Sequence, residues 1–181
     1  MAAALVSLYQ GVITVTRDSG FFPMCDVDMG QLENDGESLP LECPAMLMKI
    51  EDVIWRDVDD DLQMGVVNIS LKMIFQFSTE EEIITIPGEG RAEVIKILNL
   101  IEEYHTMITN LSGDSFNKLR RFNQYQLPIN PKNLYWIHVL QYQCNIRSDS
   151  HTPDASLDLD FDSVKNNNAF MERRKLNLIH K

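Results

Sequence analysis

The stretch VVNISLKMIFQF, from Val66 to Phe77, decides how this chain folds. Its odd-numbered positions are all apolar, while most of its even-numbered positions are polar. A period of two is typical of a strand that buries one face and exposes the other. The rest of the sequence must therefore supply a pairing strand and a layer that covers the buried face.

Three further segments supply these partners. Residues Leu134–Arg147 alternate in the same way, which predicts a second long strand paired with Val66–Phe77 in an antiparallel sheet. Apolar residues between Val94 and Leu111 recur at spacings of three and four, which predicts an amphipathic helix of about five turns. The short apolar run Ala45–Ile50 predicts a strand buried on both faces.

Other segments carry weaker patterns. Ala2–Gln10 fits either a short helix or a strand lead-in, and Gly11–Thr16 leaves the same choice open. Phe22–Pro44 is rich in Asp, Glu, Gly and Pro and predicts a long loop. We expect a hairpin connection with a solvated tip at Glu51–Leu62 and a short helical turn at Phe116–Phe122.

The chain of 181 residues fits one domain with an appendage. We expect an α+β domain over residues 1–149, with a mainly antiparallel sheet flanked by one long and one or two short helices and with extended loops. The periodic pattern weakens after Asp149, so residues 150–181 are predicted to form a C-terminal extension or arm that is disordered alone or docks on a neighbouring subunit.

Composition excludes several classes of protein. The net charge of -11 argues against a protein that binds nucleic acid by neutralising phosphates. Three cysteines, an odd number at wide spacings, predict neither a disulfide framework nor a CxxC metal site and favour a reducing cytoplasm. The opening segment lacks the basic start of a signal peptide, and no run of about 18 apolar residues predicts a membrane span.

Acidic clusters raise the question of a metal site. Four carboxylates that lie close together suggest a calcium site: Asp57, Asp59, Asp60 and Asp61. The EF-hand pattern, however, requires Gly at the position that Leu62 occupies. A solvated hairpin tip is the favoured interpretation. Asp26-Val27-Asp28 matches the weak DxD pattern for a divalent metal and leaves a metal-dependent enzyme as a minor alternative.

Residues suited to catalysis are not grouped in the sequence. His105 lies on the predicted helix stripe and His138 on an apolar strand face, so each is interpreted as a hydrogen-bonded core or interface histidine. No GxSxG motif or phosphate-binding loop occurs. We therefore expect no catalytic residues and no cofactor. Lys118, Arg120 and Arg121 form a compact basic group suited to a rim contact or to an interaction with a helix C-terminus.

The order of these elements, together with short motifs along them, resembles the small tail terminator and tail completion proteins of long-tailed bacteriophages and prophages. The resemblance covers roughly residues 22–147. Its motifs are DVDMGQL at 26–32, CPAML at 43–47, Trp55 followed by LQMG at 62–65, SFNKLRR at 115–121 and HVLQY at 138–142.

The resemblance implies a structural virion protein of the tail or neck, assembled in the host cytoplasm. Copies would close into a ring, commonly a hexamer, on the last ring of tail-tube protein. That ring would stop tube polymerisation and dock the head-tail connector, while genomic DNA passes through it without specific binding. The residues we expect at an interface or facing the lumen are Asp57, Asp59, Asp60, Asp61, Glu80, Glu81, Glu82, Arg173, Arg174 and Lys175.

Two alternatives stay open beside this hypothesis and the minor alternative of a metal-dependent enzyme. The chain fits another head-tail connector or a tail-tube-like assembly subunit. It also fits a cytoplasmic interaction module that is unrelated to phages.

Overall fold

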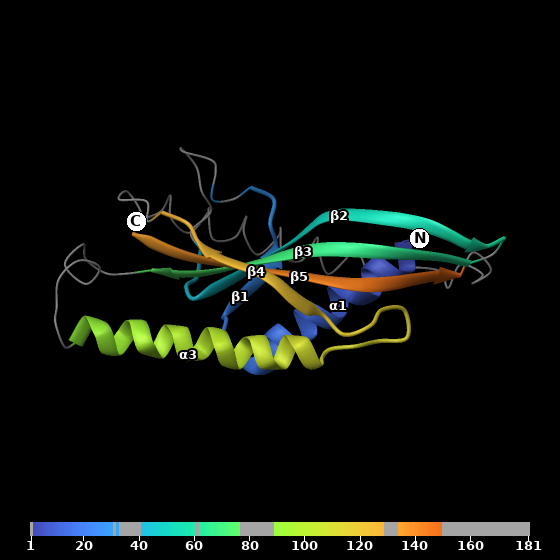
Figure 1. Ribbon diagram of the computed structural model, residues 1–181. Coiled ribbons are helices and arrows are strands. Elements are labelled where there is room, and N and C mark those ends of the chain that lie inside the picture. Colours follow the sequence, from blue (N-terminus) through green and yellow to red (C-terminus); the bar gives the residue numbers. More distant parts are fainter. Residues whose placement is uncertain are drawn as a thin grey trace, which may run out of the picture. The chain divides into compact units, whose positions relative to one another are not determined.

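The computed structural model describes residues 2–30, 32, 41–60, 62–76, 89–128 and 134–149, which all belong to the unit Met1–Ser150. This unit has an α+β fold, as predicted, with a five-stranded sheet and two helices (Figure 1). The extension predicted for residues 150–181 lies outside the described residues. The elements are α1 (Ala2–Ser19), β1 (Met24–Val27), β2 (Ala45–Asp59), β3 (Leu62–Gln76), α3 (Glu89–Asn110), β4 (Arg120–Gln126) and β5 (Tyr135–Asp149).

The sheet has the strand order β1-β2-β3-β5-β4. The predicted pairing of the two long alternating strands is confirmed, because β3 and β5 run antiparallel from Leu62 opposite Asp149 to Gln76 opposite Tyr135. β2 and β4 also pair antiparallel with their neighbours, and only the short β1 is parallel to its partner β2. The sheet is therefore mainly antiparallel with one parallel edge strand.

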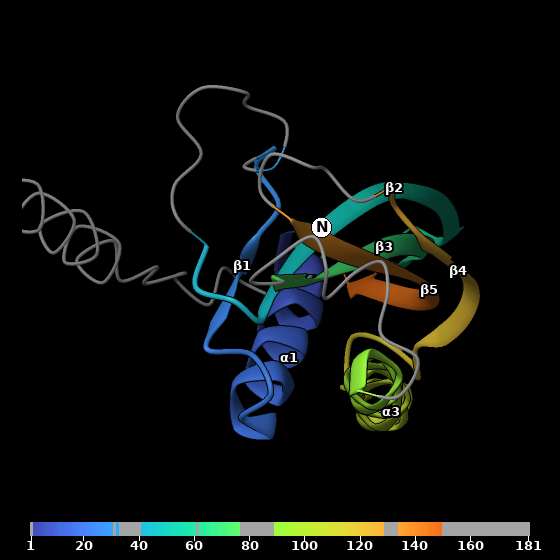
Figure 2. The same ribbon diagram turned by 90° about the vertical axis from the view of Figure 1, so that its left-hand side faces the viewer.

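Both helices cover the same face of the sheet (Figure 2). The main core lies between them and the sheet and takes alternate residues of β3, from Val67 to Phe75. The opposite face, which we call the helix-free face, has a smaller apolar cluster near the start of β2. That cluster contains Leu41, Ala45, Leu47, Ile74, Tyr135, Ile137 and Val139.

The amino-terminal segment is one helix of 18 residues, which settles the choice that the sequence left open. Its buried side chains Ala4, Leu8, Val12 and Thr16 recur every four residues and so lie on one face. The β-branched run after Gly11 imitates a strand, but packing against the core determines the helical state. α1 is therefore a long helix, whereas the sequence predicted only short helices beside the helix after Val94. No helix in the described part of the chain has the length and apolar character needed to cross a bilayer.

Two strand predictions need correction in the first half of the chain. The segment predicted as loop contains β1, whose pairing with β2 from Ala45 to Met48 covers the start of that strand. The segment predicted as a hairpin connection is the outer half of β2, which pairs with β3 as far as Asp59. Its side chains are mostly exposed on both faces, so burial leaves no alternating pattern in the sequence.

The helical turn predicted at Phe116–Phe122 is wrong. Phe116 makes an isolated bridge to Ile146, and Arg120–Gln126 forms the strand β4 along β5. Most side chains of β4 are exposed, so its backbone hydrogen bonds to β5, and not a buried face, determine its structure.

Candidate interaction surface

The outer half of β2 is an open sheet edge. β1 covers β2 only as far as Met48, and no other described strand pairs with the outer side of Lys49–Asp59. An open edge presents unpaired backbone N–H and C=O groups that are able to pair with another chain. The hairpin of β2 and β3 carries this edge to one end of the sheet (Figure 1).

The predicted carboxylates Asp57, Asp59 and Asp60 lie at the end of this edge and are exposed, as expected for a solvated tip. Asp57 accepts a hydrogen bond of 2.7 Å from the Gln63 side chain, and Asp59 accepts one of 2.9 Å from the Asp60 backbone N–H. None of these three carboxylates forms an ion pair with a described residue. The remaining predicted residues lie outside the described part of the chain: Asp61, Glu80, Glu81, Glu82, Arg173, Arg174 and Lys175.

The opposite edge of the sheet is β4, and it is basic. Among the described strands, only β5 pairs with it. Arg120 and the neighbouring Lys118 are exposed, and neither forms an ion pair with a described residue. The basic group is visible in the sequence, but its place on a strand edge is not, because the pattern of the segment predicts a helical turn.

A polar row joins the two edges across the helix-free face. Asp52 accepts a hydrogen bond of 2.9 Å from Asn68, and Asn68 accepts one of 2.9 Å from Gln143. Gln143 is the register partner of Arg120 on β4. The row therefore begins with a carboxylate at the β2 edge and ends with a guanidinium at the β4 edge.

Exposed apolar side chains lie close to both edges. Ile54 is 57% exposed and Val58 is 56% exposed on β2, while Phe122 is 56% exposed and Tyr125 41% exposed on β4. Large apolar side chains at an unpaired edge indicate an interaction surface. On the helix side of β2, Trp55 lies against Gly65, where a Cβ would come within 2.9 Å of ring atom Cε3.

One of the two carboxylates of the DxD pattern, Asp28, is held by other groups of the chain. Lys72 Nζ lies 2.6 Å from Asp28 Oδ2, and the Asp28 side chain is only 3% exposed. The Gly30 backbone N–H also donates to Asp28 at 3.0 Å. Asp28 is thus engaged by a largely buried cation, and the described residues contain no group of three or more ligating side chains suited to a metal ion.

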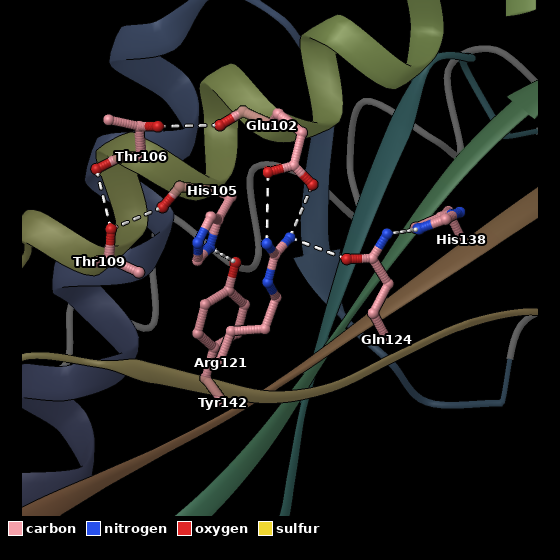
Figure 3. Close-up of polar contacts among 8 residues, drawn as sticks. All are labelled: Glu102, His105, Thr106, Thr109, Arg121, Gln124, His138 and Tyr142. Atoms are coloured by element: carbon pink, nitrogen blue, oxygen red, sulfur yellow. Dashed lines mark hydrogen bonds and ion pairs between the residues drawn. The ribbon is translucent and has the colours of Figure 1, made fainter.

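A polar cluster connects α3 to β4 and β5 (Figure 3). Arg121 binds Glu102 through both guanidinium NH groups, at 2.8 and 3.3 Å, and this contact lowers the Glu102 pKa. Arg121 also donates to Gln124 Oε1 at 2.8 Å. His105 Nδ1 lies 3.0 Å from the Tyr142 hydroxyl. The cluster fixes the basic strand to the helix layer.

His138 is held in its neutral form by this cluster. Because Gln124 Oε1 accepts from Arg121, its amide nitrogen is the group that donates to His138 Nε2, at 2.8 Å. Nε2 therefore accepts, and the imidazole proton is assigned to Nδ1. Burial lowers the pKa of both His138 and His105. The prediction that both histidines are hydrogen-bonded is confirmed.

We expect acid to destabilise this domain through these histidines. The pKa of His138 is below its usual value near 6.5 in the folded chain, so the unfolded chain binds more protons as the pH falls. The neutral His138 side chain contributes its full stabilisation above about pH 6.5, and this contribution is lost as the pH falls through the pKa of His138 in the folded chain. Urea unfolding between pH 7.5 and 5.5 should show this decline, with a shallower slope for His138→Gln. Equal slopes for the two proteins would contradict this assignment.

The described cysteines are free thiols that are poorly suited to nucleophilic chemistry. Burial raises the pKa of Cys25 to about 11 and that of Cys144 to about 12. Both are therefore protonated near neutral pH, and the thiolate is the reactive form. A hollow of about 460 Å³ lies beside the turn from Ser112 to Lys118.

Comparison of the chain with models of known protein families and with curated proteins found no match. The interaction surface is therefore inferred from the geometry of the sheet edges.

Proposed function

We propose that this chain is a structural subunit that closes into a ring at the head-proximal end of a phage tail tube. The observation that supports this most directly is the sheet with two open edges and with both helices on one face. Copies of such a subunit can stand side by side in one orientation. A head-to-tail arrangement of this kind closes when the rotation between copies completes a circle.

The fold agrees with what the resemblance to tail terminator proteins implies, a mainly antiparallel sheet flanked by helices. In this proposal the ring binds the last ring of tail-tube protein, stops tube growth and offers a docking surface to the head connector. It is part of the virion and assembles in the host cytoplasm.

The acidic hairpin tip supports a path for DNA through such a ring. Asp59 and Asp60 are exposed at the tip and form no ion pair with a described residue. Carboxylates that line a lumen repel phosphates, so DNA passes without adhering.

The test combines two experiments. Negative-stain electron microscopy of the purified full chain should show rings with a central hole wide enough for duplex DNA. Loss of the gene in a phage that encodes the chain should give tails of abnormal length. Normal-length tails without heads would instead identify a connector, and normal virions would overturn the proposal.

A further inference from the structure

The two open edges of the sheet are opposite in charge. The open part of β2, Lys49–Asp59, contains four acidic residues and two basic ones, and the exposed Asp60 follows it. The segment Lys118–Gln126 along β4 contains three basic residues and no acidic one. Because the chain as a whole carries -11, two copies repel each other unless such complementary surfaces meet.

The strand directions allow these edges to pair. β3 is antiparallel to β2, β5 is antiparallel to β3, and β4 is antiparallel to β5. β4 therefore runs opposite to β2 within one copy. A second copy in the same orientation consequently brings its β2 antiparallel to the first copy's β4, with the helices of both copies on the same face.

The lengths of the two edges are also compatible. The pairing of β1 with β2 stops at Met48, so the edge Lys49–Asp59 is open among the described strands. β4 has seven residues and is shorter than this open length. Pairing there would also cover Ile54 and Val58 of one copy and Phe122 and Tyr125 of the next.

We infer that copies of this chain join by antiparallel pairing of the β2 edge, Lys49–Asp59, with β4 of the next copy. This inference rests on the proposed ring and names its interface. Main-chain hydrogen bonds supply the attachment, as in strand addition generally. The charges select the partner, because Arg120 then lies opposite one of the residues Trp55–Asp59, which brings Lys118 and Arg120 close to Asp57. Asp52 adds to the acidic charge of the same edge farther along the strand.

Charge reversal tests the interface in trans. The variant Lys118→Glu/Arg120→Glu makes both edges acidic, and the variant Asp52→Lys/Asp57→Lys makes both edges basic. Each variant on its own should assemble only at a protein concentration more than about tenfold higher than the wild type needs. An equimolar mixture should recover assembly, because each acidic edge then meets a basic one. Sedimentation velocity on the full chain measures these differences.

A matched control separates the interface from net charge. Arg17→Glu/Lys96→Glu makes the same charge change on exposed positions of the two helices and should assemble like the wild type. Circular dichroism checks that every variant is folded.

The possible outcomes keep this inference distinct from the proposed function. Rings that form equally well in both edge variants, or a mixture that fails to recover, would overturn the β2–β4 interface and leave ring formation intact. A wild-type chain that stays monomeric at every concentration would also overturn the interface. The tail-length experiment then decides the proposed function by itself.

Discussion

Replacing Asp28 with alanine is expected to destabilise the domain by about 3 kcal/mol, because it removes the nearest counter-charge of the largely buried Lys72 ammonium. The Lys72 side chain is 16% exposed and so has little access to water. A loss of this size lowers the melting temperature by about 10 °C in a chain of this length. Differential scanning calorimetry measures the change.

The neighbouring carboxylate provides a matched control. Asp26 lies two residues earlier on β1, is exposed, and accepts a hydrogen bond only from the adjacent Val27 backbone among the described contacts. Asp26→Ala should change stability by less than about 0.5 kcal/mol. The double variant Asp28→Leu/Lys72→Met should recover most of the loss, since it removes both charges together. Equal effects of Asp26→Ala and Asp28→Ala would contradict this account.

Replacing Tyr104 with alanine is expected to cost about 3–5 kcal/mol, because Tyr104 is fully buried and joins the two helices. Its ring packs edge-on against Phe22 with centroids 5.2 Å apart. Its hydroxyl lies 2.6 Å from Thr16 Oγ1, which itself donates to the Val12 carbonyl. Urea unfolding followed by circular dichroism measures the loss.

The variant Tyr104→Phe separates the ring from the hydroxyl. Thr16 keeps its bond to Val12 in that variant, so only about 1 kcal/mol should be lost. A loss for Tyr104→Phe close to that for Tyr104→Ala would mean that the hydrogen bond, and not the packing of the ring, stabilises the helix pair.

The predictable part of this fold is the part with one buried face. β3, β5 and α3 bury one side along most of their length, so periods of two and of three to four residues identified them. The outer half of β2 and most of β4 bury neither side, and their structure depends on hydrogen bonds to strands distant in sequence. In α1 the β-branched residues after Gly11 favoured a strand locally, and tertiary packing overrode them.

The candidate surface was predictable only in its acidic half. A run of aspartates predicts a solvated tip from composition alone, and the described members of that run are exposed. The basic edge depends on the register that places Arg120 opposite Gln143, and the Asp28–Lys72 pair depends on the crossover that places β1 beside β2. Neither relation leaves a local pattern in the sequence.

The position of Trp55 gives this chain a built-in optical reporter. It is one of only two tryptophans, and it lies on the open strand β2 against Gly65, whereas Trp136 is 6% exposed in the core. In a Trp136→Phe background all indole emission comes from the edge strand. Its wavelength and its quenching by iodide would therefore follow the arrival of a neighbouring strand in real time, without any attached dye.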